Sequence, residues 1–217
     1  MNTEHYPHWP AGLPHTLTPP QTSVCANLAI SAIRYPDKTA LEFYGRRLSY
    51  RQLQDEVDAL AGYLQQACCV QRGDRVLLQM QNSPQFVIAF YAILRADALI
   101  VPVNPMLLND ELRHVVEDSG AKLALCAQDL LPELVPLLET SPLSRIIVAC
   151  YADYLGQCSE ELPDWLVAKR AEIDNARIIQ WTDALMAKCI PAPGLSGADD
   201  LACLLYTSGT TGKPKAC

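Results

Sequence analysis

The sequence predicts an α/β fold in which alternating strands and helices form a largely parallel, layered sheet. Short apolar runs at 75–80, 98–103, 122–126 and 145–150 have the composition of strands that are buried on both faces. Amphipathic segments of helical period lie between them. The chain has 217 residues, of which 50% are hydrophobic, so it is long enough to bury a substantial core. Strands that alternate with helices favour parallel pairing.

The first 21 residues differ in composition from the rest of the chain. They contain five of the sixteen prolines and three of the four histidines, and they show little periodicity. We expect residues 1–21 to form an extended arm. His5 and His8 have a spacing that a metal could use, but the arm offers no clear third ligand. A solvent-facing pair of histidines is the favoured interpretation.

Regular structure is expected from Thr22 onward. A helix over 22–34 must end before Pro36, because a residue that precedes proline avoids helical angles. A strand is predicted at Thr39–Tyr44, and Gly45 turns the chain toward Leu48. This begins an α/β N-terminal subdomain that we expect to span residues 22–190.

Capping residues mark where several helices begin. Ser49 with Gln52 three residues later forms a predicted capping box, and Ser83-Pro84 opens another helix. Asn109 is the predicted cap of a helix that Gly120 ends. The other elements expected are helices at 129–139, 160–173 and after Thr182, a strand near 178–179, a surface linker over 191–200, and a buried strand over 201–206.

Composition and charge exclude several classes of protein. The formal net charge is −7, which argues against a nucleic-acid partner, since such a surface needs a basic patch. The longest apolar run, 86–94, is too short for a transmembrane segment, which needs roughly 20 residues. The N-terminus shows no secretory signal. The nine cysteines include no Cys-x-x-Cys pair, so we expect reduced thiols, no metal site and a cytoplasmic location.

A polar run after the last predicted strand carries the chemistry. Residues 206–215 read Tyr-Thr-Ser-Gly-Thr-Thr-Gly-Lys-Pro-Lys. Its hydroxyls can donate to phosphate oxygens, and its glycines let backbone N–H groups approach an anion. Pro214 stands where a Walker-type loop needs Ser or Thr, which argues against a P-loop NTPase. The candidate phosphate-binding residues are Thr207, Ser208, Gly209, Thr210, Thr211, Gly212, Lys213 and Lys215.

This run resembles the signature loop of the adenylate-forming (AMP-binding) superfamily. Two upstream segments also match that family: Leu48–Leu53 and Leu94–Pro105. The likeness covers residues 22–217 and is nearest to bacterial fatty-acid–CoA ligases, as in 80–86 and 103–106. Two departures from the family are Asp97 and Ala216, which stand where glycine is usual.

The resemblance implies a ligase that joins a carboxylic acid, here a fatty acid, to CoA through an acyl-adenylate, using ATP and Mg²⁺. In such enzymes the loop holds the ATP β- and γ-phosphates. The hydroxyls of Ser208, Thr210 and Thr211, the N–H groups of 209–212 and the charge of Lys215 would do so here. Catalytic residues would lie downstream of Cys217, so residues 191–217 would be a linker, a strand and the start of a truncated loop. The fragment alone is expected to be inactive.

Three alternatives remain open from the sequence. The first is an adenylation domain that acts on another carboxylic acid or loads a carrier protein. The second is a non-catalytic nucleotide-binding homologue, which Ala216 slightly favours. The third is a flavodoxin-like module, which leaves the loop unexplained.

Overall fold

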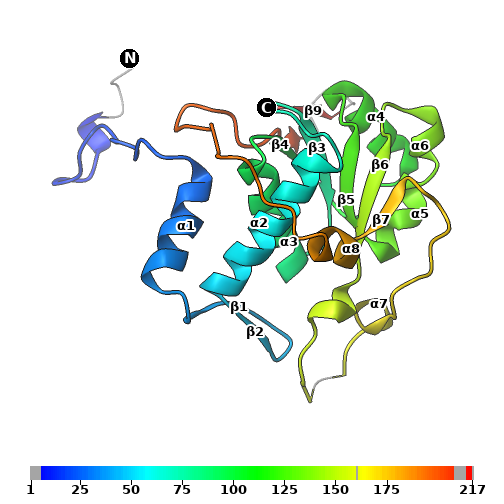
Figure 1. Cartoon of the computed structure of the whole chain (residues 1–217). Coiled ribbons are helices and arrows are strands. Elements are labelled where there is room, and N and C mark those ends of the chain that lie inside the picture. The colour runs from blue at the N-terminus through cyan, green and yellow to red at the C-terminus, as the bar shows by residue number, and fades with distance from the viewer. Residues whose placement is uncertain (1–5, 160, 208–213, 217) are drawn as a thin grey trace.

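A five-stranded parallel sheet forms the centre of the computed structural model, which describes residues 6–159, 161–207 and 214–216 (Figure 1). Its strand order is β4-β3-β5-β6-β7, and every pairing between neighbours is parallel. The strands are β3 (Arg75–Gln79), β4 (Leu99–Pro102), β5 (Leu123–Ala127), β6 (Arg145–Ala149) and β7 (Ile178–Gln180). The predicted α/β fold with a largely parallel, layered sheet is confirmed.

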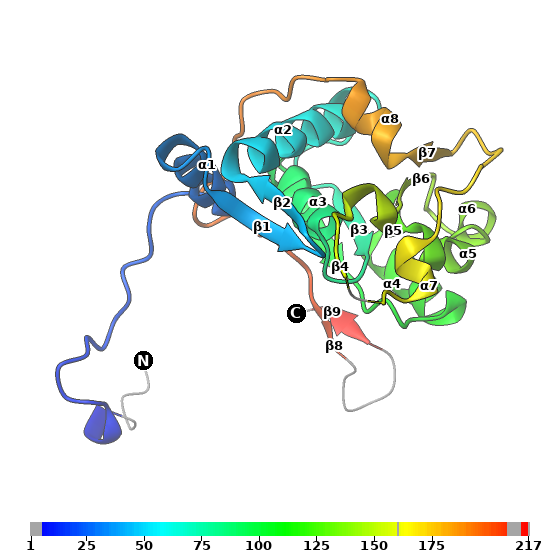
Figure 2. The same ribbon diagram turned by 90° about the horizontal axis from the view of Figure 1, so that it is seen from below.

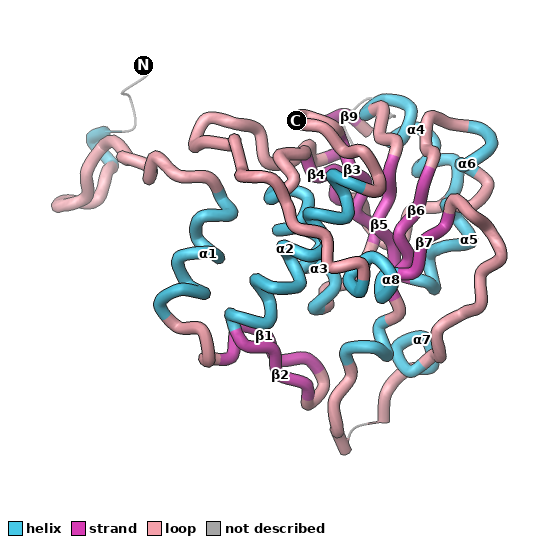
Figure 3. Tube along the Cα trace, in the orientation of Figure 1, coloured by secondary structure: helices cyan, strands magenta, loops and turns pink. Residues whose placement is uncertain are grey.

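Helices cover both faces of the sheet (Figures 1 and 3). One layer contains α1 (Val24–Arg34), α2 (Tyr50–Gln66), α3 (Pro84–Arg95) and α8 (Trp181–Met186). The other contains α4 (Asn109–Ser119), α5 (Leu131–Leu134) and α6 (Leu137–Thr140). Successive strand residues point to opposite faces, so Val76 and Leu78 pack into the first layer while Leu77 packs into the second.

Two predicted helix caps are present. The Ser49 hydroxyl accepts from the Gln52 N–H at 3.2 Å, and the Gln52 side chain accepts from the Ser49 N–H at 2.8 Å. This is the predicted capping box at the start of α2. The Ser83 hydroxyl accepts from the Phe86 N–H, and Pro84 is the first residue of α3. Both predictions are confirmed.

The strand and turn predicted before α2 form a separate hairpin. β1 (Thr39–Phe43) pairs antiparallel with β2 (Arg46–Ser49). Gly45, at φ 81°, makes the turn, and a Cβ there would lie 2.2 Å from the carbonyl oxygen of Gln157. Glycine is therefore required both by the backbone angle and by the close approach of a distant loop.

Two helix predictions were wrong in length. Over the described residues 161–173, the helical part is α7 (Asp164–Val167), in which Leu166 is buried while Trp165 and Val167 are exposed. Such a segment has too little apolar surface to stabilise a longer helix. The region 129–139 is divided into the 3-10 helix η2 (Gln128–Leu130), α5 and α6. Pro136, which cannot donate a backbone hydrogen bond, lies between α5 and α6.

The start of α4 also differs from the prediction. Leu108, not Asn109, is the N-cap, and its N–H donates to the Glu111 carboxylate at 3.1 Å. The Asn109 amide instead donates to the Glu133 carbonyl at 2.9 Å and so ties α4 to α5. Gly120 ends the helix at φ 66°, as predicted.

The N-terminal segment lies apart from the layered body (Figure 2). It contains the 3-10 helix η1 (Tyr6–His8), and residues 7–22 are exposed. The rings of Tyr6 and His15 are in contact, with their centroids 4.1 Å apart. Another 3-10 helix, η3 (Tyr151–Tyr154), follows β6. Among the described residues, the helices are all too short or too polar to cross a bilayer.

Candidate phosphate-binding site

The chain approaches the candidate loop along the free edge of β4. The Ile100 N–H donates to the Ala202 carbonyl at 3.1 Å, and the Leu204 N–H donates to the Ile100 carbonyl at 2.8 Å. These bonds place Cys203 in a parallel bridge with Ile100, and residues 201–205 are called the edge segment below. The buried strand predicted over 201–206 is therefore wrong. Contact on one side only leaves Leu201 71% and Leu205 53% exposed.

A short hairpin flanks the loop. β8 (Tyr206–Thr207) pairs antiparallel with β9 (Lys215–Ala216), and the register sets Thr207 directly opposite Lys215. Both residues are exposed. The hairpin thus brings together a hydroxyl and an ammonium group from the two ends of the predicted site. The other candidate residues, Ser208, Gly209, Thr210, Thr211, Gly212 and Lys213, lie outside the described residues.

Side chains of α4 contact Tyr206 in β8 and Pro214, the residue just before β9. The Tyr206 hydroxyl donates to the Asp118 carboxylate at 2.6 Å. The Nε2 atom of His114 lies 2.9 Å from the Pro214 carbonyl oxygen. Because a carbonyl oxygen only accepts, Nε2 carries the proton in this bond. Burial raises the pKa of Tyr206, and the hydrogen bond to Asp118 raises it further.

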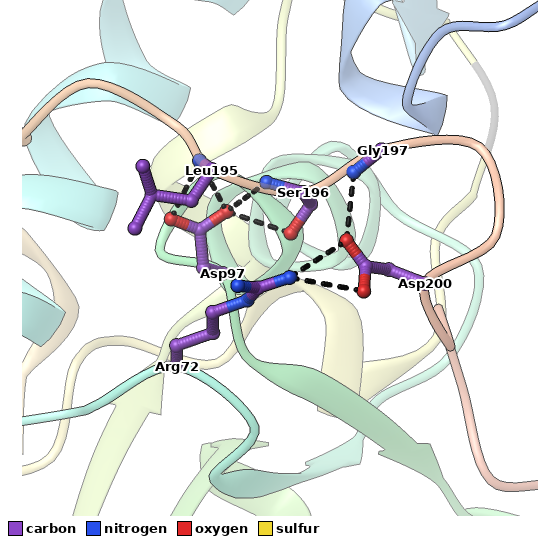
Figure 4. Close-up of polar contacts among 6 residues, drawn as sticks. All are labelled: Arg72, Asp97, Leu195, Ser196, Gly197 and Asp200. Atoms are coloured by element: carbon purple, nitrogen blue, oxygen red, sulfur yellow. Dashed lines mark hydrogen bonds and ion pairs between the residues drawn. The ribbon is translucent and has the colours of Figure 1, made fainter.

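Asp97 fixes the linker that precedes the edge segment (Figure 4). Its Oδ1 accepts from the Ser196 N–H at 2.8 Å and from the Ser196 hydroxyl at 2.6 Å. Both of its oxygens lie 3.0 Å from the Leu195 nitrogen. Asp97 has φ 59°, in the left-handed region, and its own carbonyl accepts from the Gly73 N–H. A carboxylate in this position acts as a cap for the linker backbone.

A second carboxylate closes the same turn. Asp200 accepts two hydrogen bonds from Arg72, each 3.0 Å long, and one from the Gly197 N–H at 2.7 Å (Figure 4). The Gly197 N–H, and after it the charge of Arg72, lowers the pKa of Asp200. The predicted surface linker lacks regular structure, but these bonds give it a defined course.

The sequence did not reveal the supporting roles of His114, Asp118 and Asp97. His114 and Asp118 are four residues apart and so share one face of α4. That spacing is visible in the sequence, but nothing local connects it to a loop about 100 residues later. Asp97 was noticed only as a departure from the usual glycine.

Thiols and metal-ligand types do not add a second site. The eight cysteines in the described part of the chain are free thiols. Cys126 is fully buried in β5, and this burial raises its pKa. Over residues 6–159, 161–207 and 214–216, His, Cys, Asp and Glu form no group of three that could hold a metal ion.

The five-stranded parallel sheet with helices on both faces places the chain in the α/β class of folds. The family model of the AMP-binding enzymes matches residues 28–217, and the chain belongs to that family. Its members among curated proteins include ligases that join acids to CoA.

Comparisons with individual proteins agree with this assignment. The chain is 31% identical over 215 residues to a long-chain-fatty-acid–CoA ligase of Bacillus subtilis, a match that covers 95% of this chain and 38% of the relative. It is also 31% identical to a crotonobetaine/carnitine–CoA ligase of Citrobacter koseri, over 83% of this chain and 33% of the relative. The crystal structure of an anthranilate CoA ligase with anthranoyl-AMP superposes with a TM-score of 0.73 at 23% identity, covering 91% of this chain and 35% of that one. The chain thus spans between 33% and 38% of the length of these relatives.

Proposed function

We propose that this chain provides the ATP phosphate-binding portion of an acid–thiol ligase that activates a fatty acid as an acyl-adenylate and transfers it to CoA. Family membership and the fatty-acid–CoA ligase relatives support the reaction class. The observation that carries the site is the hairpin register, which sets Thr207 opposite Lys215 at the base of the hydroxyl-rich loop. The described residues alone do not complete the reaction in this proposal, since the catalytic groups would come from the rest of a longer protein.

The donor set suits a polyphosphate. The Lys215 ammonium can offset phosphate charge, and the Thr207 hydroxyl can donate to a phosphate oxygen. The net charge of −7 does not prevent this, since exposed charges are screened beyond about 8 Å at physiological salt. ATP supplies the adenylyl group and the pyrophosphate leaving group, and Mg²⁺ would arrive with the nucleotide. The work of this chain is to position the phosphates and neutralise their charge.

The test uses the complete reading frame and measures carboxylate-dependent ATP–pyrophosphate exchange. Short, medium and long fatty acids are compared with carnitine, benzoate and amino acids. We expect fatty acids to stimulate exchange, and CoA to consume the adenylate that forms. Exchange only with a different acid would support the alternative adenylation domain. No exchange from folded protein with Mg²⁺ would refute the enzyme assignment.

A matched pair of variants tests the site. Lys215→Gln should lower the exchange rate by roughly a hundredfold, the usual effect of removing one group that stabilises transition-state charge. Lys169→Gln removes the same charge from another exposed lysine and should leave the rate unchanged. Equal exchange rates in the two variants would show that Lys215 takes no part in phosphate binding.

A further inference from the structure

We propose that His114 and Asp118 are positioning residues, which hold the two sides of the β8–β9 hairpin and so keep Thr207 opposite Lys215 at the proposed phosphate site. This inference rests on the proposed function, because it assigns a purpose to the loop. His114 holds the Pro214 carbonyl at 2.9 Å, and Asp118 holds the Tyr206 hydroxyl at 2.6 Å. Along the sequence, one contact comes before residues 208–213 and the other comes after them.

The construction of α4 allows it to serve both the core and the loop. One face, comprising Leu112, Val115, Val116 and Ser119, is buried against the sheet. His114 and Asp118 are one turn apart on a different face, half-buried and exposed respectively. The helix is therefore fixed by its packing against the sheet, and its second face can hold the hairpin at a fixed distance from the sheet.

The hairpin needs such external support. Each of its arms has two residues, and an isolated two-stranded hairpin is marginal in water. The edge segment before it is joined to β4 by two backbone hydrogen bonds around Ile100. Beyond that attachment, α4 adds one hydrogen bond to Tyr206 in the first arm and one to Pro214, just before the second arm. Without either contact, Thr207 and Lys215 would no longer be held opposite each other.

The test uses the 217-residue chain and magnesium tripolyphosphate as the probe. His114→Ala and Asp118→Ala should each weaken binding roughly fivefold, the effect of losing about one net hydrogen bond. Nuclear magnetic resonance should show weaker cross-strand Overhauser effects between Thr207 and Lys215 in both variants. Glu117→Ala, an exposed change on the same helix, should alter neither quantity.

Conservative variants separate positioning from general stability. His114→Gln can still donate from its side-chain amide, and Asp118→Asn can still accept, so both should recover most of the affinity. Melting temperatures that match the Glu117→Ala control would show that the effect is local.

Several outcomes would overturn the inference. Unchanged cross-strand contacts in both alanine variants would show that α4 does not hold the hairpin. Altered contacts with wild-type affinity would show that the hairpin position is irrelevant to phosphate. If the wild-type chain binds no tripolyphosphate, the anchors act on a loop without this ligand and the inference also fails. The fatty-acid-dependent exchange reaction then decides separately whether the proposed function survives.

Discussion

Replacing Asp97 tests whether one carboxylate determines the course of the linker that leads to the loop. Asp97 is 9% exposed, and its carboxylate accepts hydrogen bonds from two backbone N–H groups and one hydroxyl of residues 195 and 196. Hydrogen bonds to a charged group contribute about 1.5–3 kcal/mol each. Their sum overstates the loss, because freed backbone groups of a surface segment can bind water. Each released residue also regains about 1–2 kcal/mol of conformational entropy.

These opposing terms leave a net cost of about 2 kcal/mol for Asp97→Ala. Asp97→Gly should cost about 1 kcal/mol less, because glycine adopts the left-handed angle of φ 59° without a Cβ penalty. Asp97→Asn keeps the Oδ1 acceptor for Ser196 and tolerates the same angle, so it should also cost about 1 kcal/mol. The predicted order of stability is wild type, then Asn and Gly together, then Ala.

Urea unfolding followed by circular dichroism measures the global effect, and amide hydrogen exchange at Leu195 and Ser196 measures the local one. A change of 2 kcal/mol corresponds to about thirtyfold faster exchange in Asp97→Ala. A glycine variant as stable as the wild type would show that the hydrogen bonds of the carboxylate only offset the cost of the left-handed backbone angle at Asp97. Equal stability of the glycine and alanine variants would refute the argument from backbone angle.

Two further predictions concern pH and packing. Burial raises the pKa of Glu56 above its ordinary 4.5, so its contribution to stability is complete below about pH 4.5 and is lost as the pH rises through the folded-state pKa. Glu56→Gln should therefore flatten the fall in the free energy of unfolding above pH 4.5, and an unchanged pH profile in urea titrations would contradict this. Leu125→Ala, in the central strand, should cost about 2–5 kcal/mol, whereas Leu205→Ala, at a side chain 53% exposed, should cost under about 1 kcal/mol by the same titration. Similar costs at the two positions would show that the edge segment is packed more tightly than its exposure indicates.

Local signals in the sequence were sufficient for most of the fold. Ser49 and Ser83 could be assigned as caps because the hydrogen bonds that they accept come from residues three positions away. The buried strands β3 and β5 were visible because both of their faces are apolar. The caps and the buried strands are determined by residues close together in the sequence, so a local pattern is enough to predict them.

Predictions failed where the outcome depended on distant partners. The apolar run at 201–206 has the composition of a buried strand, but Leu201 and Leu205 have no second layer over them within the described residues. Asn109 has the chemistry of a cap, yet its amide is used by Glu133, 24 residues later. Neither the missing layer nor the contact with Glu133 can be read from the residues close by in the sequence. For the candidate site, the sequence supplied the loop but not the residues that support it.

The supporting residues lie close together in the sequence, on β4 and the segments on either side of it. Asp97 lies two residues before β4, Ile100 lies within it, and His114 and Asp118 are on the helix that follows it. Going along the later segment, Asp97 holds 195–196, Ile100 holds 202–204, and α4 holds 206 and 214. A single strand and its flanks thus fix the later chain at successive points up to the base of the loop. Each attachment is made separately to the same packed body, so releasing the first leaves the later ones in place. Variants at Asp97 should therefore speed amide exchange at Leu195 and Ser196 and leave the exchange of Leu204, which is bonded to Ile100, unchanged.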